Sequence, residues 1–229
     1  MFHKNNITAN LEYQEKKDGG TYRWINLSIR LVMNPNSNEI IAYLLFKNID
    51  DEKQKAIKNQ KLIENDPLTG IYNRKTFELK VKEKIREQKQ NEFLFAMLIL
   101  DLDVFKPIND TFGHAEGDLV LMEVAHSIAS LLREYDLTCR LGGDEFMIYL
   151  CEIPNRAIIN TKAQQICHLL HRTYKEKFQL SASIGIALNP NDATTFDELY
   201  KKADKALYYV KNHGKNNFAF YNKSIMEDD

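Results

Sequence analysis

The sequence predicts an α+β fold in which helices flank a central, mostly antiparallel sheet. Residues 93–100 form a nearly unbroken apolar run, which is typical of a buried strand. Residues 140–150 read as two short apolar strands joined at Gly142 and Gly143, where adjacent glycines supply the positive φ angles of a tight hairpin. Stretches with apolar residues at helical spacing lie between and after these strands. Elements in this order favour one sheet with helices on its faces.

The first part of the chain, residues 1–50, is expected to be an antiparallel β segment. Its strands are predicted over residues 11–17, 21–33 and 40–46. Asp18-Gly19-Gly20 is a hairpin signal between the first two strands, and an Asn- and Pro-containing turn separates the last two. Apolar residues alternate along the middle strand, as expected when one face of a sheet is covered.

A polar stretch follows, residues 51–65, and is predicted to form a helical linker. Ile49, Ala56 and Ile63 stand at heptad spacing, but two repeats are too few to establish a coiled coil. A linker that pairs two chains and a solvated connector helix therefore both remain open. Pro67 ends this helix.

The remainder, residues 66–229, is expected to form one domain. Four helices are predicted, over residues 75–90, after Gly117, over residues 155–174 and from residue 196 to Gly214. Thr195 and Glu198 have the spacing of a capping box at the start of the last helix. Residues 180–188 read as a further strand, and residues 218–221 as a short edge strand.

The composition, 44% hydrophobic and 28% charged over 229 residues, indicates one sizeable core plus a smaller module. The net charge of −1 argues against a protein that coats nucleic acid. Cys139, Cys151 and Cys167 fit neither a disulfide framework nor a zinc site and are expected to be free thiols in a reducing cytosol. No apolar run is long enough to span a bilayer, and no signal-peptide pattern follows Met1. A soluble, cytoplasmic chain is expected, and a longer parent protein with membrane segments before Met1 stays open.

Carboxylates stand at the ends of the two central strand stretches. Asp144 and Glu145 follow the hairpin glycines, and Asp101 and Asp103 end the first apolar run. If these strands pair, acids from both meet at one edge of the sheet. Clustered carboxylates repel one another unless a cation joins them, and oxygen-only ligands suit Mg²⁺ or Mn²⁺. The sequence therefore indicates a divalent-metal site, with an ordinary solvated turn as the alternative.

The hairpin residues Gly142-Gly143-Asp144-Glu145-Phe146 resemble the signature of GGDEF domains, the diguanylate cyclases that make cyclic di-GMP from two GTP. The resemblance runs from about Asp66 to Tyr221. It extends to five further motifs, at residues 66–74, 101–110, 113–118, 183–187 and 203–208. It implies a palm-like sheet related to nucleotide cyclases and attack of one GTP's 3′-hydroxyl on the α-phosphate of another, with loss of pyrophosphate.

Residues 1–50 resemble, more loosely, the last three strands of a PAS sensor domain. A small β module or dimerisation piece without a ligand is the alternative. The expected organisation is thus a partial PAS-like segment over residues 1–50, a linker over 51–65 and a GGDEF domain over 66–229.

The resemblance also implies a metal and phosphate site. Two ions per active site, Mg²⁺ or Mn²⁺, are expected on Asp101, the Leu102 carbonyl, Asp144 and Glu145. Glu145 is the group expected to help deprotonate the 3′-hydroxyl. Phosphate is expected to contact Lys106 and the backbone N–H groups of Val104 and Phe105, which form a local anion nest.

Guanine is expected to bind Asn109 and Asp118, because a carboxylate at the second position favours guanine over adenine. A turn cap at Asn109 and a helix N-cap at Asp118 are the alternatives. Lys211 and Lys215 match two basic positions, although the family usually has Arg at the second, and Lys loses the bidentate fork. His114 matches a family His near the substrate, with no assigned role.

Arg133 and Asp136 match the family's RxxD site, at which the product cyclic di-GMP inhibits the enzyme. A salt pair at a helix end is the alternative. The resemblance implies a homodimer, because each half-site holds one GTP and the reaction needs two. Two other functions remain open, a catalytically weak GGDEF module that binds GTP or cyclic di-GMP as a regulatory sensor, and a cyclase with relaxed base choice.

Overall fold

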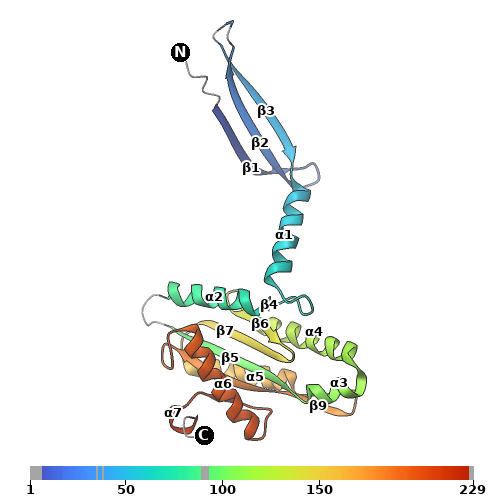
Figure 1. The fold of residues 1–229 in the computed structure, drawn as a ribbon, viewed down its shortest axis with the longest axis vertical. Helices are drawn as coiled ribbons and strands as arrows, with labels where there is room; N and C mark the ends of the chain where they lie inside the picture. The colour runs from blue at the N-terminus through green and yellow to red at the C-terminus, as the bar shows by residue number, and fades with distance from the viewer. Residues whose placement is uncertain (1–6, 35, 38, 89–92, 227–229) are drawn as a thin grey trace. The chain divides into compact units, whose positions relative to one another are not determined.

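The computed structural model describes residues 7–34, 36–37, 39–88 and 93–226 of the chain. The chain folds as two compact units, Met1–Ile63 and Glu64–Asp229 (Figure 1). Within the described residues, no helix combines the length and the apolarity that crossing a lipid bilayer requires.

The first unit is a three-stranded antiparallel sheet followed by one helix. The sheet has the order β1-β2-β3, formed by β1 (Ile7–Lys16), β2 (Tyr22–Met33) and β3 (Ile40–Asn48). Gly19 and Gly20, in the turn between β1 and β2, have φ angles of 98° and 86°. The antiparallel β segment predicted for the start of the chain is therefore confirmed.

Helix α1 (Asp50–Glu64) follows β3 directly and contains no buried residue. Its first turn is joined to the sheet, since the Trp24 backbone N–H donates to Asp50 Oδ1 at 2.7 Å. Of the three heptad positions, Ile49 lies before the helix and is buried, whereas Ala56 and Ile63 lie exposed on the helix. These exposed side chains are compatible with both interpretations of the linker.

The second unit contains a mixed, mostly antiparallel sheet. Its strands are β4 (Tyr72–Asn73), β5 (Leu94–Asp103), β6 (Leu137–Gly142), β7 (Glu145–Ile153), β8 (Arg172–Tyr174), β9 (Phe178–Asn189) and β10 (Phe218–Phe220). The main path is β10-β9-β5-β7-β6-β4, and β8 pairs with β9. Only the short outer strands β10 and β4 run parallel to their neighbours among these pairs. The predicted fold class is confirmed.

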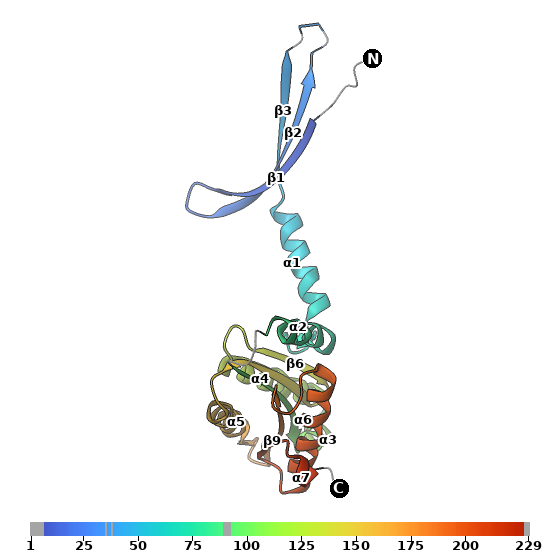
Figure 2. The ribbon, with the colours of Figure 1, turned by 90° about the vertical axis from the view of Figure 1, so that its left-hand side faces the viewer.

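Helices cover both faces of this sheet, as Figure 2 shows for α5 and α6. They are α2 (Arg74–Glu87), α3 (Phe105–Phe112), α4 (His114–Leu131), α5 (Arg156–Leu170), α6 (Phe196–Asn212) and the short α7 (Lys223–Met226). Because side chains alternate along a strand, β5 contributes to two cores. Leu98 packs in one core with Val124 of α4, and Met97 packs in the other with Phe77 of α2 and Leu199 of α6.

The helix predicted over residues 155–174 is too long. Helix α5 ends at Leu170, and residues 172–174 form β8 instead. Tertiary contacts override the helical pattern here, because β8 pairs with β9 and the Tyr174 ring packs edge-on against Phe112 at 6.3 Å between centroids. The helix predicted over 75–90 spans Arg74–Glu87, and Gln90 lies outside the described residues.

The last helix begins as predicted, because the Glu198 backbone N–H donates to the Thr195 side-chain oxygen at 3.3 Å. It ends at Asn212, two residues before the predicted stop at Gly214. Gly185 of β9 lets this helix approach the sheet closely. A Cβ atom at Gly185 would lie 2.0 Å from the carbonyl oxygen of Ala203.

Candidate active site

Strand pairing brings the predicted acids together. Strand β5 runs antiparallel to β7 with Asp101 directly opposite Glu145, and the Leu102 N–H donates to the carbonyl oxygen of Asp144 at 3.3 Å. Gly142 and Gly143 have φ angles of 152° and 54°, so the turn uses the backbone freedom that the sequence predicts for this hairpin. Carboxylates from a strand end and a hairpin therefore share one edge of the sheet.

The electrostatics of this edge are those of crowded acids. Burial, followed by the negative charge of Asp101, raises the pKa of both Asp144 and Glu145 above their ordinary values. Lys211 of α6 forms an ion pair with Asp101, with 2.7 Å between Nζ and Oδ2. The charge of Lys211, joined at Asp144 by that of Arg140, offsets only part of this effect, because the pKa of both carboxyls stays raised.

The chemistry of the donors fits a hard divalent cation. Carboxylate and backbone carbonyl oxygens are the ligands of Mg²⁺ and Mn²⁺, and Mg²⁺ usually completes its coordination with waters and substrate phosphates. In the described part of the chain, no group of three or more His, Cys, Asp or Glu side chains is already gathered as metal ligands. The residues that could hold an ion are Asp101, Asp144 and Glu145, together with the Leu102 carbonyl.

The segment after β5 has an unusual backbone. Val104 precedes α3 and has φ 67° and ψ 12°, a left-handed conformation that is rare for a β-branched residue. The side chain of Phe105 is buried in the core, so only its backbone can face a ligand. Lys106 follows with an exposed side chain. This combination of a strained turn and an exposed cation is typical of functional loops.

The two predicted guanine-binding residues lie on neighbouring helices. Asn109 is in α3, and its Oδ1 atom is buried without a hydrogen-bond partner among the described residues. Gly117 of α4 makes room for it, because a Cβ atom there would lie 1.8 Å from Oδ1. The turn-cap interpretation of Asn109 is therefore wrong. A buried polar atom that lacks a partner is costly unless a ligand supplies one.

Asp118 is exposed on α4, in the second turn of the helix. The helix begins at His114 with Gly113 as its N-cap, so the N-cap interpretation of Asp118 is wrong. His114 is exposed as the first residue of the helix. Lys215 follows α6, is exposed and has a φ angle of 59°.

Arg133 and Asp136 form a close pair with each other. Asp136 accepts from Arg133 Nε and Nη2, both at 3.1 Å, and from the Cys151 backbone N–H at 3.0 Å. The Asp136 side chain is 0% exposed and that of Arg133 is 37% exposed. The predicted salt pair is thus formed. A ligand can reach Arg133, whereas Asp136 is covered and positions the guanidinium.

Residues 63–217, more than half of the chain, match the family model described as "Diguanylate cyclase, GGDEF domain". The chain belongs to the GGDEF family. The matched range contains the hairpin acids, the strained turn at Val104 and both predicted guanine-binding residues.

Individual GGDEF proteins support this assignment. The chain is 38% identical over 176 residues to the bifunctional diguanylate cyclase/cyclic di-GMP phosphodiesterase MucR of Pseudomonas aeruginosa, covering 74% of this chain and 26% of MucR. A solved GGDEF domain of TpbB from Pseudomonas aeruginosa is 35% identical, with a TM-score of 0.65 over 69% of this chain and 94% of that one.

A third relative is the GGDEF domain of DgcB from Caulobacter crescentus, solved in complex with cyclic di-GMP. It is 26% identical, with a TM-score of 0.62 over 69% of this chain and 95% of that one.

The chain spans only about a quarter to a third of the length of the curated relatives, 26% of MucR and 36% of TpbB.

Arg140 is a residue of the GGDEF domain that the sequence reasoning missed. Its Nε donates to the Gly143 carbonyl at 3.0 Å, and its Nη1 contacts Asp66 Oδ1 at 3.4 Å. The side chain therefore joins the hairpin to the turn after α1. Asp66 and Arg140 are 74 positions apart, so no local pattern connects them.

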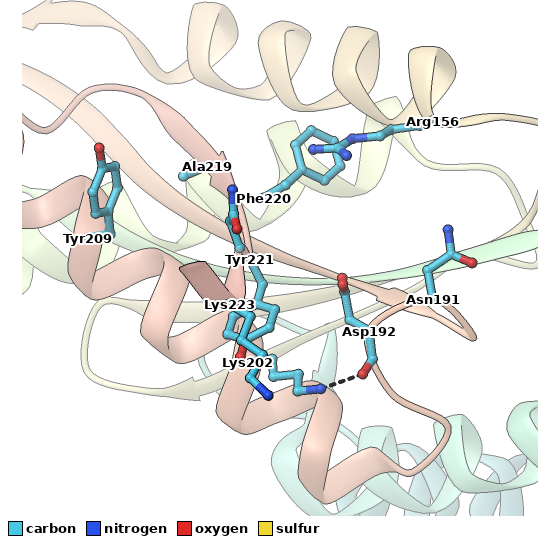
Figure 3. A pocket seen from close by; sticks show the side chains of 10 residues that line it. Arg156, Asn191, Asp192, Lys202, Tyr209, Ala219, Phe220, Tyr221 and Lys223 are labelled. Atoms are coloured by element: carbon cyan, nitrogen blue, oxygen red, sulfur yellow. Dashed lines mark hydrogen bonds between the residues drawn. The ribbon is translucent and has the colours of Figure 1, made fainter. Parts of the chain in front are cut away.

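A cavity of about 650 Å³ lies apart from the clustered acids, between α6, β10 and the segment after β9 (Figure 3). The Arg156 guanidinium lies over the Phe220 ring at 4.0 Å, and Lys202 donates to the Asp192 carbonyl oxygen. None of the predicted site residues lines this cavity. The cavity is therefore not part of the candidate active site.

Proposed function

We propose that this chain is a diguanylate cyclase that condenses two GTP into cyclic di-GMP and pyrophosphate. The observation that carries the proposal is the direct pairing of Asp101 with Glu145, beside Asp144, in a GGDEF fold. Three acids at one sheet edge suit a reaction in which charge on a triphosphate must be neutralised.

In the proposed reaction, the 3′-oxygen of one GTP attacks the α-phosphorus of the other. In this attack a P–O bond forms, the bond to pyrophosphate breaks, and the hydroxyl proton moves to the Glu145 carboxylate. The reciprocal attack, by the 3′-oxygen of the second GTP on the α-phosphorus of the first, closes the ring in the same way and releases the second pyrophosphate. A divalent ion held by the acids would supply charge neutralisation and activation of the hydroxyl.

The remaining residues bind and orient the nucleotide. Asn109 has a buried amide oxygen that lacks a partner, which guanine N–H donors would supply, and Asp118 on the adjacent helix would accept from the same base edge. Lys106, Lys211 and Lys215 are the cations proposed for the triphosphate. A carboxylate at position 118 argues against relaxed base choice, because adenine would leave it unpaired.

Each proposed half-site holds one GTP, so turnover requires two chains to face each other as a homodimer.

Arg133 is proposed to bind the product, as a planar guanidinium can bind a phosphate and a guanine edge. The β segment at residues 7–48 is proposed to be part of a PAS-like sensor module, which supplies the input to the cyclase.

The test is incubation of the purified chain with GTP and Mg²⁺, with products separated by chromatography. A D144A/E145A variant serves as the control. We expect cyclic di-GMP from the native chain and none from the variant. No product at high protein concentration, after bound product is stripped, would contradict the proposal and favour a GGDEF module that only binds GTP or cyclic di-GMP.

A further inference from the structure

A second carboxylate on β5 plays no part in the proposed ligand set. Asp103 follows Asp101 by two positions, so the two side chains lie on the same face of the strand. Asp103 is only 4% exposed. A carboxylate that is withdrawn from water to this extent needs several donors to stabilise it.

Three donors reach Asp103. The Ser181 and Ser183 hydroxyls of β9 donate to its two oxygens at 2.7 and 2.8 Å. The backbone N–H of Asn216 donates to Oδ2 at 3.0 Å. The serines fix the carboxylate on the sheet, and the third hydrogen bond links it to a segment 113 residues further along the chain.

That segment is the turn after α6, and its backbone is unusual. Gly214, Lys215 and Asn216 have φ angles of 102°, 59° and 44°, so two residues other than glycine adopt the left-handed conformation in succession. Residues with side chains avoid this conformation unless the surroundings impose it. The Lys215 N–H bonds to the Val210 carbonyl on one side, and Asp103 holds the next residue on the other.

We propose that Asp103 is a positioning residue for the nucleotide phosphates. It acts through the Asn216 backbone and holds the left-handed turn so that the ammonium of Lys215 faces the triphosphate. This inference rests on the proposed function, because it assigns the phosphates of GTP to Lys215. Strand β5 would thus contribute two carboxylates to the site. Asp101 belongs to the acid cluster, and Asp103 positions the turn that carries Lys215.

The test is a double-mutant cycle on the full chain with D103N and K215A. The Asn side chain nearly keeps the shape of Asp but replaces a charged acceptor, and a hydrogen bond to a charged group typically changes a binding constant by about tenfold or more. We expect D103N and K215A each to raise the KM for GTP about tenfold, with kcat changed much less. The double variant should have the same KM as K215A alone. D103N is expected to act only by displacing Lys215, and K215A has already removed that ammonium.

A second measurement needs no nucleotide. The amide hydrogen exchange of Asn216, followed by NMR, should become at least about tenfold faster in D103N. If D103N folds poorly, S183A keeps the carboxylate, removes one of its donors and should give the same non-additivity with K215A at smaller size.

Additive effects on KM, or unchanged amide hydrogen exchange at Asn216, would overturn the positioning role of Asp103. Production of cyclic di-GMP by the native chain would still support the proposed cyclase activity. The converse outcome is a native chain that does not turn over GTP. Non-additive losses of GTP affinity, measured by calorimetry with Mg²⁺, would then uphold the positioning role and reject the cyclase.

Discussion

Glu145 is the residue at which binding and chemistry can be separated. Glutamine keeps its size and one acceptor oxygen but cannot take the proton of a 3′-hydroxyl. We expect E145Q to lower turnover by at least about a hundredfold, the usual effect of losing a general base. GTP binding should be weakened by the loss of one metal ligand but should persist, because the proposed base-binding residues and lysines are unchanged. Steady-state kinetics and calorimetry check the two parts, with E83Q on the exposed face of α2 as the matched control.

Arg133 offers a second prediction at the scale of one side chain. Its exposed guanidinium is held by a fully covered Asp136. R133A should raise the cyclic di-GMP concentration needed for half inhibition at least about tenfold and leave the KM for GTP unchanged, because the pair lies outside the acid cluster. Unaltered inhibition would remove Arg133 from the product site. R86A, which removes an exposed arginine of α2, is the control.

The protonation of the Asp66 carboxyl is expected to affect the stability of the second unit, Glu64–Asp229. Burial alone would raise its pKa, but the hydroxyl and amide of Thr69 and the charge of Arg140 outweigh burial and lower it. A lowered pKa in the folded state means that the charged form stabilises the fold at neutral pH. This contribution is lost as the pH falls from about 4, the ordinary value, through the folded-state pKa.

The D66N variant should therefore lose about 1–3 kcal/mol of unfolding free energy at pH 7, the cost of a broken charged hydrogen-bond set. The difference from the native chain should shrink below about pH 4. Urea unfolding at several pH values measures this, with the exposed Asp110 changed to Asn as the control. A difference that stayed constant with pH would show that Asp66 does not act through its charge.

At the scale of elements, the close packing of α6 on β9 places Lys211 at the acids. G185A would put a Cβ atom 2.0 Å from the Ala203 oxygen and 2.2 Å from the Leu207 nitrogen, so helix or strand must shift. We expect a loss of about 1–3 kcal/mol in unfolding free energy, as for other overpacked cores. We also expect weaker GTP binding, since α6 carries Lys211. Native stability in denaturant unfolding would show that the two elements can separate at no cost.

The same scale explains how far the sequence predicts the fold. Extended apolar patterns identify β5, β7 and the helices α2, α4, α5 and α6. In each of them the buried side chains recur with the spacing of the strand or helix. The two-residue strand β4 and the short β8 have no such period and form only by pairing with β6 and β9. The acids at the hairpin were predictable because strand ends and glycine turns are local signals.

The sequence places Asp103 among the strand-end acids, but neither its proposed positioning role nor the contacts of Arg140 could be predicted from it. Their decisive partners, Asn216 and Asp66, stand 113 and 74 positions away. Likewise, the burial of the Asn109 amide oxygen without a hydrogen-bond partner follows from its packing against Gly117 of the next helix. Such contacts depend on how elements pack, which no pattern within one stretch of chain contains.

At the scale of the whole molecule, the first unit leaves much apolar surface uncovered. All nine residues of β3 are exposed, and Leu44, Leu45 and Phe46 are 55%, 67% and 59% exposed. Neighbouring residues of a strand point to opposite faces, so both faces of β3 are apolar. Exposed apolar surface of this kind favours association with another protein surface.

Association matters for the proposed chemistry, because two GTP-loaded half-sites must meet. We expect the specific activity of the full chain to rise with protein concentration until dimers predominate. Replacing Leu45 and Phe46 by Lys should move this rise to higher concentration, since charge on both faces of β3 opposes burial of the strand. The change leaves the acids and lysines of the GGDEF domain untouched. Activity assays over a dilution series, with sedimentation velocity alongside, test this. A specific activity independent of concentration, with monomers in the ultracentrifuge, would exclude a reaction between two chains.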